Sequence, residues 1–370
     1  MKNTHFVLFF SLLLFISCGG DDTTERQPTS DNFDRGSMLV HWADNFILPG
    51  YTALETSLNG LEVAATSFTQ VPTASSLENV RNSWLSAYEA FQMVSMFEIG
   101  IAEQLNFRNS LNVYPTNTSE LDALVASGTW NLELPSTLDV QGFPALDYLF
   151  HGLGTDQETI ASFSTVAGAQ NYKAYVIDLI QTMKTLTAQV KSDWSGQYRE
   201  TYVANTSSSA AGSVDQTVNA FLFYYEKALR AGKVGIPAGV FSGSPLPQNV
   251  EGLYSQENSK KLLEIALEAA QNFFNGNGVN GSSGDSLKAY LDTLNTVKND
   301  TDLSSLIDAQ FDAAETKISG LETNFSNQIE SNNAKMLESY DELQRNVVLL
   351  KVDMLQALSI DVNYVDADGD

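Results

Sequence analysis

Prolines are absent from two long stretches of this chain, and their absence limits the choice of fold. A proline inside an α-helix breaks it, because proline has no backbone N–H and its ring clashes with the preceding turn. The sequence has no proline between Pro144 and Pro237, and none after Pro247. Long helices can therefore run through most of the chain beyond Pro144.

Apolar side chains recur three and four positions apart, the spacing that places them on one face of a helix. Such stripes cover positions 39–47, 54–68, 80–91, 172–194, 214–229, 262–273 and 336–358. Pro49 falls between the first two stripes and predicts one kinked helix or two short ones. The Ser75–Glu78 segment has the Ser-x-x-Glu form of a capping box, which predicts a helix start. Few runs have the two-residue period of a strand, so we expect an all-α fold of two antiparallel bundles packed together.

A small, polar segment over residues 205–213 separates the predicted helices into two sets. Its composition is typical of a flexible connection between packed units. The sequence therefore predicts an N-terminal helical bundle over residues 34–204 and a C-terminal bundle over residues 214–370.

The first residues predict export. Lys2 precedes an apolar run over residues 6–16, which has the length of a signal-peptide core and is too short to span a bilayer. Ser17 and Cys18 follow directly and resemble a bacterial lipobox, in which a signal peptide over residues 1–17 is removed and Cys18 is lipidated. Residues 18–33 then form a flexible acidic tether, similar to the surface-export signals of Bacteroidetes lipoproteins. We expect a protein anchored in outer-membrane lipid, on the periplasmic or the outer side; the alternative is ordinary secretion.

Charge and cysteine content exclude several classes of function. The chain has 45 acidic and 20 basic side chains, a formal net charge of −25, which repels nucleic acid. Cys18 is the only cysteine, so an internal disulfide and a thiolate metal site are excluded.

Familiar catalytic motifs are missing from the sequence. His41 and His151 are the only histidines beyond the predicted signal peptide, and no His-Glu-x-x-His zinc motif or Gly-x-Ser-x-Gly elbow is present. Gly276–Gly281 matches Gly-x-Gly-x-x-Gly, but it follows a predicted helix where a nucleotide site needs a strand, so we interpret it as a loop. Asp366–Asp370 lacks the distal Glu of a calcium loop and is interpreted as an acidic tail.

Two segments combine structural and functional signals. Gln141–Phe150 places Pro144 near a helix start with Asp147 in the first turns, and His151 follows as a helix-end residue. Glu226–Gly239 ends a helix in a turn rich in Lys and Gly, where the lysines complement the helix dipole. Both segments are consistent with simple capping as well as with a site.

These segments, together with Trp84–Glu89 and Phe97–Gly100, resemble the imelysin-like family, also called peptidase family M75, and its Bacteroidetes lipoproteins in particular. The resemblance implies two related four-helix bundles with a functional site where they meet, and a role in iron or haem acquisition. The family signature is Gly-x-His-x-x-Glu; here Gly142 matches, Pro144 replaces the His and Asp147 replaces the Glu. Because the imidazole is lost, the peptidase activity that the family name implies is not supported.

Our leading hypothesis is a non-catalytic envelope lipoprotein that binds a ligand between the bundles and works with an uptake transporter. The candidate ligand-binding residues are Gly142, Pro144, Asp147, Tyr148, Glu89, Glu226 and Lys233. Asp147 and Glu226 are weak candidates for metal ligands, with iron, another divalent cation or haem as the bound group. The alternatives are a metal-dependent peptidase, or a purely structural or interaction lipoprotein in which Asp147 and Glu226 are ion-paired and bind no ligand.

Overall fold

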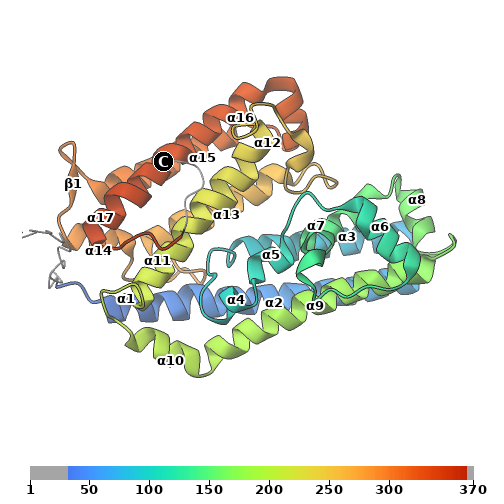
Figure 1. Ribbon diagram of the computed structural model, residues 1–370, viewed down its shortest axis with the longest axis horizontal. Helices are drawn as coiled ribbons and strands as arrows, with labels where there is room; N and C mark the ends of the chain where they lie inside the picture. Colours follow the sequence, from blue (N-terminus) through green and yellow to red (C-terminus); the bar gives the residue numbers. More distant parts are fainter. Residues whose placement is uncertain (1–31, 365–370) are drawn as a thin grey trace, which may run out of the picture. The chain divides into compact units, whose positions relative to one another are not determined.

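The computed structural model describes residues 32–364, and in that part the regular secondary structure is almost entirely helical (Figure 1). The predicted signal peptide, Cys18, nearly all of the predicted tether and Asp366–Asp370 lie outside the described residues. Among the residues that are described, the only strands are β1 (Val297–Lys298) and β2 (Thr301–Asp302), which pair as a short antiparallel hairpin. The predicted all-α fold is confirmed.

The first half of the described chain forms a bundle of four helical elements. They are the run of α1 (Arg35–Trp42) and α2 (Leu48–Gln70), then α3 (Ala74–Gln92), α7 (Gly142–Asp147) and α9 (Ala169–Ser195). Helix α2 packs against α3 and α9, and α7 also packs against both. Shorter helices complete this half: α4 (Ile101–Gln104), α5 (Phe107–Leu111), α6 (Thr118–Ser127), the 3-10 turn Pro135–Val140, α8 (Asp156–Ser162) and α10 (Gln197–Ala204).

The second half repeats the four-helix arrangement. Its long elements are α11 (Ser213–Phe223), α13 (Ser259–Asn275), α15 (Leu303–Ser319) and α16 (Phe325–Val348). Helix α11 continues as a π-helical segment, Tyr224–Gly235, into α12 (Ile236–Ala238), and α16 continues through the π-helical Leu349–Met354 into α17 (Leu355–Leu358). The 3-10 turn Pro247–Asn249 and helix α14 (Leu287–Thr293) connect these elements.

Pro49 does not interrupt the first helix, because a π-helical segment, Ala43–Ile47, precedes it. Proline cannot donate to the carbonyl one turn before it. That carbonyl, on Asn45, instead accepts a hydrogen bond from the backbone N–H of Val279 at 3.0 Å. Val279 belongs to the Gly276–Gly281 segment, which is a loop as the sequence predicts. A loop of the second half therefore completes the hydrogen bonding of the first helix.

The predicted capping box is placed two residues too late. Helix α3 begins at Ala74, and its N-cap is Thr73, which follows Pro72 in an extended conformation. The backbone N–H of Ser76 donates to Oγ1 of Thr73 at 3.2 Å, and that of Thr73 donates to Oγ of Ser76 at 3.0 Å. A serine therefore fills the role that the sequence pattern assigns to Glu78.

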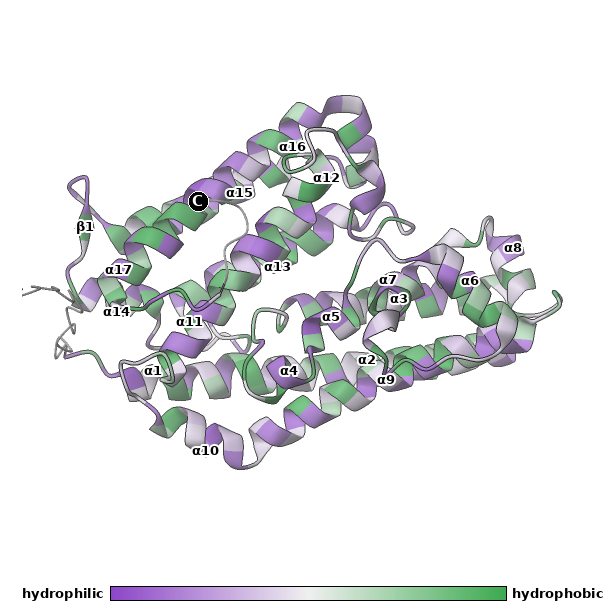
Figure 2. Cartoon of the chain, viewed as in Figure 1, coloured by the Kyte–Doolittle hydropathy of each residue, from purple (hydrophilic) through white to green (hydrophobic). Residues whose placement is uncertain are grey.

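The two bundles share one hydrophobic core, to which each long helix contributes buried apolar residues; hydrophobic and hydrophilic residues are interspersed along these helices (Figure 2). Trp42 of α1 packs on Phe273 of α13 with ring centroids 4.9 Å apart, and helix α3 also packs against α13. Residues 205–212 connect α10 to α11 where the sequence predicts the boundary; that they separate two domains stays a prediction. Within residues 32–364 no helix is both long enough and apolar enough to cross a membrane.

Candidate functional site

A cavity of about 240 Å³ lies between the two bundles. Its walls come from the end of α3, the segment that includes α5 and the loop after it, and the π-helical segment Tyr224–Gly235. The polar side chains that line it include those of Gln92, Arg108, Asn109, Asn112, Tyr224 and Lys233. Of the seven residues predicted for a ligand site, Lys233 is the one that reaches this cavity.

Lys233 forms a buried ion pair with Glu251, a residue that no sequence pattern distinguishes. Both side chains are at most 4% exposed. Burial lowers the pKa of Lys233 from its ordinary 10.5, and the adjacent Glu251 carboxylate opposes that shift. A buried charge without a partner costs several kcal/mol, so each of these two groups requires the other.

Side chains from the first bundle complete the environment of this ion pair. Oε1 of Glu251 accepts hydrogen bonds from the Tyr88 hydroxyl at 2.9 Å, Nδ2 of Asn112 at 2.8 Å and Nε2 of Gln92 at 3.2 Å. The Lys233 ammonium donates to Oε1 of Gln92 at 2.9 Å. Burial, and then Glu251, raise the pKa of Tyr88 well above 10.0, so its hydroxyl stays a donor. The Lys233–Glu251 pair is thus held by residues of both bundles.

The turn that ends the helix carrying Lys233 depends on its glycines. A Cβ on Gly235 would lie 2.7 Å from the Tyr340 ring, so glycine lets the turn pack closely on α16. Pro237 lies in α12, and Gly239 ends that helix in the left-handed conformation. The turn segment that the sequence analysis singled out therefore has a packing role, and it fixes the position of Lys233.

Asp147 holds the segment that carries Glu251. Its Oδ2 accepts a hydrogen bond from the backbone N–H of Tyr254 at 2.9 Å, and its side chain is buried. Its Oδ1 lies 3.1 Å from Nδ1 of His151, which also lies 3.3 Å from the Asp147 carbonyl oxygen. Asp147 thus connects α7 to residues 251–254, and it positions the Lys233–Glu251 pair without lining the cavity.

Gly142 and Pro144 serve the packing of α7. Gly142 has φ +73°, and a Cβ there would lie 2.1 Å from the carbonyl oxygen of Leu111, so only glycine fits. Phe143 stacks on Tyr88 with ring centroids 4.4 Å apart. Pro144 is buried beside it and offers no side-chain donor or acceptor.

Tyr148, Glu89 and Glu226 lie away from the cavity. The Tyr148 hydroxyl donates to Asp122 at 3.0 Å, and Glu89 forms an ion pair across the bundle interface with Lys261. Glu226 is fully buried, and its carboxylate contacts Lys227 at 2.9 Å, Lys351 at 3.1 Å and the Tyr364 hydroxyl at 2.7 Å. The predicted set is therefore divided among separate places, and Asp147 and Glu226 do not form one site.

A metal centre does not fit the family-motif position of this chain. Pro144 has no ligating atom. The Asp147 carboxylate accepts from Tyr254 through Oδ2, whereas its Oδ1, 3.1 Å from Nδ1 of His151, is buried and makes no well-formed hydrogen bond. Across residues 32–364, no three or more His, Cys, Asp or Glu side chains are grouped so that they could hold a metal ion.

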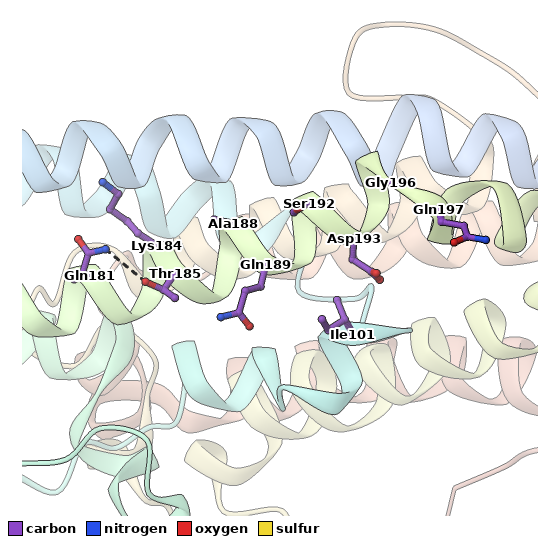
Figure 3. Close-up of a pocket in the computed structure, with 10 residues that line it drawn as sticks. All are labelled: Ile101, Gln181, Lys184, Thr185, Ala188, Gln189, Ser192, Asp193, Gly196 and Gln197. Carbon is purple, nitrogen blue, oxygen red and sulfur yellow. Dashed lines mark hydrogen bonds between the residues drawn. The ribbon is translucent and has the colours of Figure 1, made fainter.

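Two of the other hollows among the described residues are larger than this cavity. One, of about 690 Å³, is a groove along α9 lined mainly by uncharged polar side chains such as Gln181, Gln189 and Ser192 (Figure 3). None of the predicted site residues lines it. The other, of about 880 Å³, shares Arg108, Asn109 and Ala228 with the inter-bundle cavity.

Comparison with known proteins identifies the family. The imelysin family model, peptidase family M75, matches residues 47–350, and the chain belongs to that family. An imelysin-like protein from Psychrobacter arcticum has the same fold, with a TM-score of 0.71 and 16% identity over 91% of this chain and 100% of that one. A protein assigned as an iron-regulated protein A precursor, from Parabacteroides distasonis, gives a TM-score of 0.69 and 19% identity over 89% of this chain and 96% of that one.

A curated relative matches over a shorter span. Iron-regulated protein A of Synechococcus elongatus is 25% identical over 113 residues, which are 30% of this chain and 29% of that protein. The match therefore covers less than a third of either chain.

Proposed function

We propose that this chain is a non-catalytic accessory protein of the cell envelope that acts in iron acquisition and binds its ligand in the inter-bundle cavity. The observation that carries the proposal is the Lys233–Glu251 pair, a buried charged group that borders a cavity and is held by both bundles. Buried polar groups beside a concave space are typical of ligand sites. The names of the two iron-regulated relatives support the link to iron.

Filling the cavity tests whether the function needs it. Ala228 lines the cavity, so an Ala228→Trp side chain would occupy it. Ala188 lines the exposed groove of Figure 3, and Ala188→Trp is the matched control. We expect a strain that lacks the protein to grow more slowly under iron limitation, and growth to return with wild type or Ala188→Trp but not with Ala228→Trp. Full rescue by Ala228→Trp contradicts a role for the cavity, and normal growth of the deletion strain contradicts the role in iron acquisition.

The proposed location depends on Cys18, which lies outside the described residues. Its lipobox-like context supports an outer-membrane anchor, and partnership with an uptake transporter follows as part of the same proposal. We expect Cys18→Ser to move the protein from the membrane fraction to the soluble fraction. Retention of the variant in the membrane fraction would contradict lipid anchoring at this residue.

A further inference from the structure

The side chains that face the inter-bundle cavity are unusual for so acidic a protein. Arg108 and Lys233 line the cavity, and none of its lining residues is Asp or Glu, although the chain has a net charge of −25. The carboxylates of Glu98 and Glu251 pair with these cations without lining the cavity. A molecule inside the cavity therefore meets the positive partner of each pair first.

Several hydrogen-bond donors of these residues are not used within the protein. The Lys233 ammonium has three N–H donors and makes two contacts, to Gln92 and Glu251. The Arg108 guanidinium donates to the carbonyl oxygen of Ser95 at 3.1 Å, which uses one of its five N–H groups. Tyr224 is buried, and its hydroxyl makes no well-formed hydrogen bond, although Ser95 is near it. This surplus of donors calls for a ligand with several acceptor oxygens.

The ion pair of Arg108 with Glu98 leaves its guanidinium available. The shortest distance between their charged groups is 3.8 Å, and the Glu98 oxygens accept instead from the backbone N–H of Arg108 at 3.1 and 3.3 Å. Burial raises the pKa of Glu98, more than Arg108 lowers it. Arg108 also lines the hollow of about 880 Å³, which shares three lining residues with the cavity.

We propose that the inter-bundle cavity binds a small oxyanion, a carboxylate or inorganic phosphate, between Arg108 and Lys233. This inference deepens the proposed function and rests on it. The volume of about 240 Å³ is below the roughly 300–1,000 Å³ of pockets for drug-sized ligands, so the occupant is small. Arginine and lysine are the side chains best suited to carboxylate and phosphate oxygens, arginine through two parallel N–H groups.

Titration calorimetry on the full chain in detergent tests this inference. Citrate and inorganic phosphate are titrated separately at constant ionic strength, with sodium chloride as the control for screening. We expect at least one of the two anions to bind, at least tenfold more weakly to Arg108→Gln, and not measurably to the double variant Lys233→Met/Glu251→Leu. The double variant removes both members of the ion pair, so it leaves no unpaired buried charge.

The matched control is Lys191→Met, which removes one positive charge from an ion pair with Glu55 elsewhere on the surface. Anion affinity should be unchanged in this variant. Binding of citrate alone would identify the ligand as a carboxylate, and binding of phosphate alone would identify it as inorganic phosphate. The inference is overturned if neither anion binds wild type beyond the chloride control, or if all variants bind equally.

The failure of this inference is separable from that of the proposed function. If no anion binds, but Ala228→Trp still fails to restore growth under iron limitation, the oxyanion inference is wrong and the role of the cavity stands. If anion binding follows the expected pattern and the deletion strain grows normally, the oxyanion site stands and the role in iron acquisition is wrong.

Discussion

Glu226 and Glu251 are both buried carboxylates paired with lysine, yet their surroundings differ. Glu226 is closed in by Lys227, Lys351 and Tyr364, all from the second half of the chain. Glu251 receives hydrogen bonds from Tyr88, Gln92 and Asn112 of the first half, and its lysine borders a cavity. A buried charge satisfied within one bundle stabilises that bundle, whereas one shared between two bundles beside a space can serve a ligand.

The surroundings of these buried charges also distinguish two hypotheses for the chain, ligand binding and a purely structural role. The purely structural alternative predicts that Asp147 and Glu226 are ion-paired. Glu226 has lysine partners, and Asp147 lies 3.1 Å from His151, which is charged only when protonated. Lys233 is also ion-paired, but it faces a cavity. Function is therefore better sought at Lys233 than at the two carboxylates first proposed as metal ligands.

The largest loss of stability is expected from breaking the Lys233–Glu251 ion pair, which residues of both bundles hold. Glu251→Leu leaves the Lys233 ammonium buried without a counter-charge, so we expect a loss of about 3–5 kcal/mol in the free energy of unfolding, measured with urea. Lys233→Met/Glu251→Leu removes both charges and should recover most of that loss. A double variant as unstable as the single one would show that the charge pair is not the cause.

Removing the Glu226 carboxylate should cost less stability than removing that of Glu251, and it should leave anion binding intact. Glu226→Gln weakens the charge-assisted hydrogen bonds from Lys351 and Tyr364, so we expect a loss of about 1.5–3 kcal/mol by the same measurement. Anion affinity in the inter-bundle cavity should match that of wild type. A large fall in anion affinity would show that Glu226 is coupled to the Lys233–Glu251 pair, so that its role would not be confined to its own bundle.

Asp147 connects α7 to the segment that carries Glu251, and removal of its side chain should cause a smaller loss of stability than the two changes above. Asp147→Ala leaves the Tyr254 N–H without its acceptor, with an expected loss of about 1–2 kcal/mol in the free energy of unfolding. Asp147→Asn retains an acceptor oxygen and should lose less. If the Ala and Asn variants are equally stable, the hydrogen bond to Tyr254 is not what Asp147 contributes.

Asp215 extends the comparison to a buried carboxylate whose environment favours its neutral form. Burial raises its pKa from 3.8 to about 6, and Arg35 only partly offsets that shift. The folded state therefore binds the proton more tightly than the unfolded state, and the contribution of Asp215 to stability is present below pH 4 and lost as pH rises through 6. Asp215→Asn should remove this loss of stability with rising pH. If the pH dependence of thermal unfolding between pH 4 and 7 is the same in the variant as in wild type, the prediction is wrong.

The long helices were predictable because their signal is local. The stripe over residues 172–194 corresponds to α9 and that over 262–273 to α13, since side chains three and four apart share one face of a helix. The boundary of α3 was misplaced by two residues, because Thr73 and Ser76 make a capping box that a search for Ser-x-x-Glu does not find. Pro49 left the choice open between one kinked helix and two short ones. The chain continues as one helical run, in which a distant N–H, that of Val279, satisfies the carbonyl that Pro49 leaves free.

Site residues were predictable only where they belonged to a recognisable segment. Lys233 lies in the Gly- and Pro-rich turn that resembles the imelysin-like family. Glu251 lies in a loop between the 3-10 turn Pro247–Asn249 and α13, where no periodicity distinguishes it from the other acidic residues of the chain. Arg108 lies on the short helix α5, which gives no stripe long enough to detect.

The amino-acid sequence alone determines the helices and their apolar faces, because helix formation and amphipathic burial depend on neighbours a few residues apart. Short segments of the sequence also indicated the family. The ion pairs and the cavity depend on contacts made in the folded chain. Gln92, Asn112 and Glu251 meet across 139 to 159 positions of sequence, through bundle packing that no local pattern encodes. Burial then decides which charges matter, because removing water makes the presence or absence of a partner worth several kcal/mol.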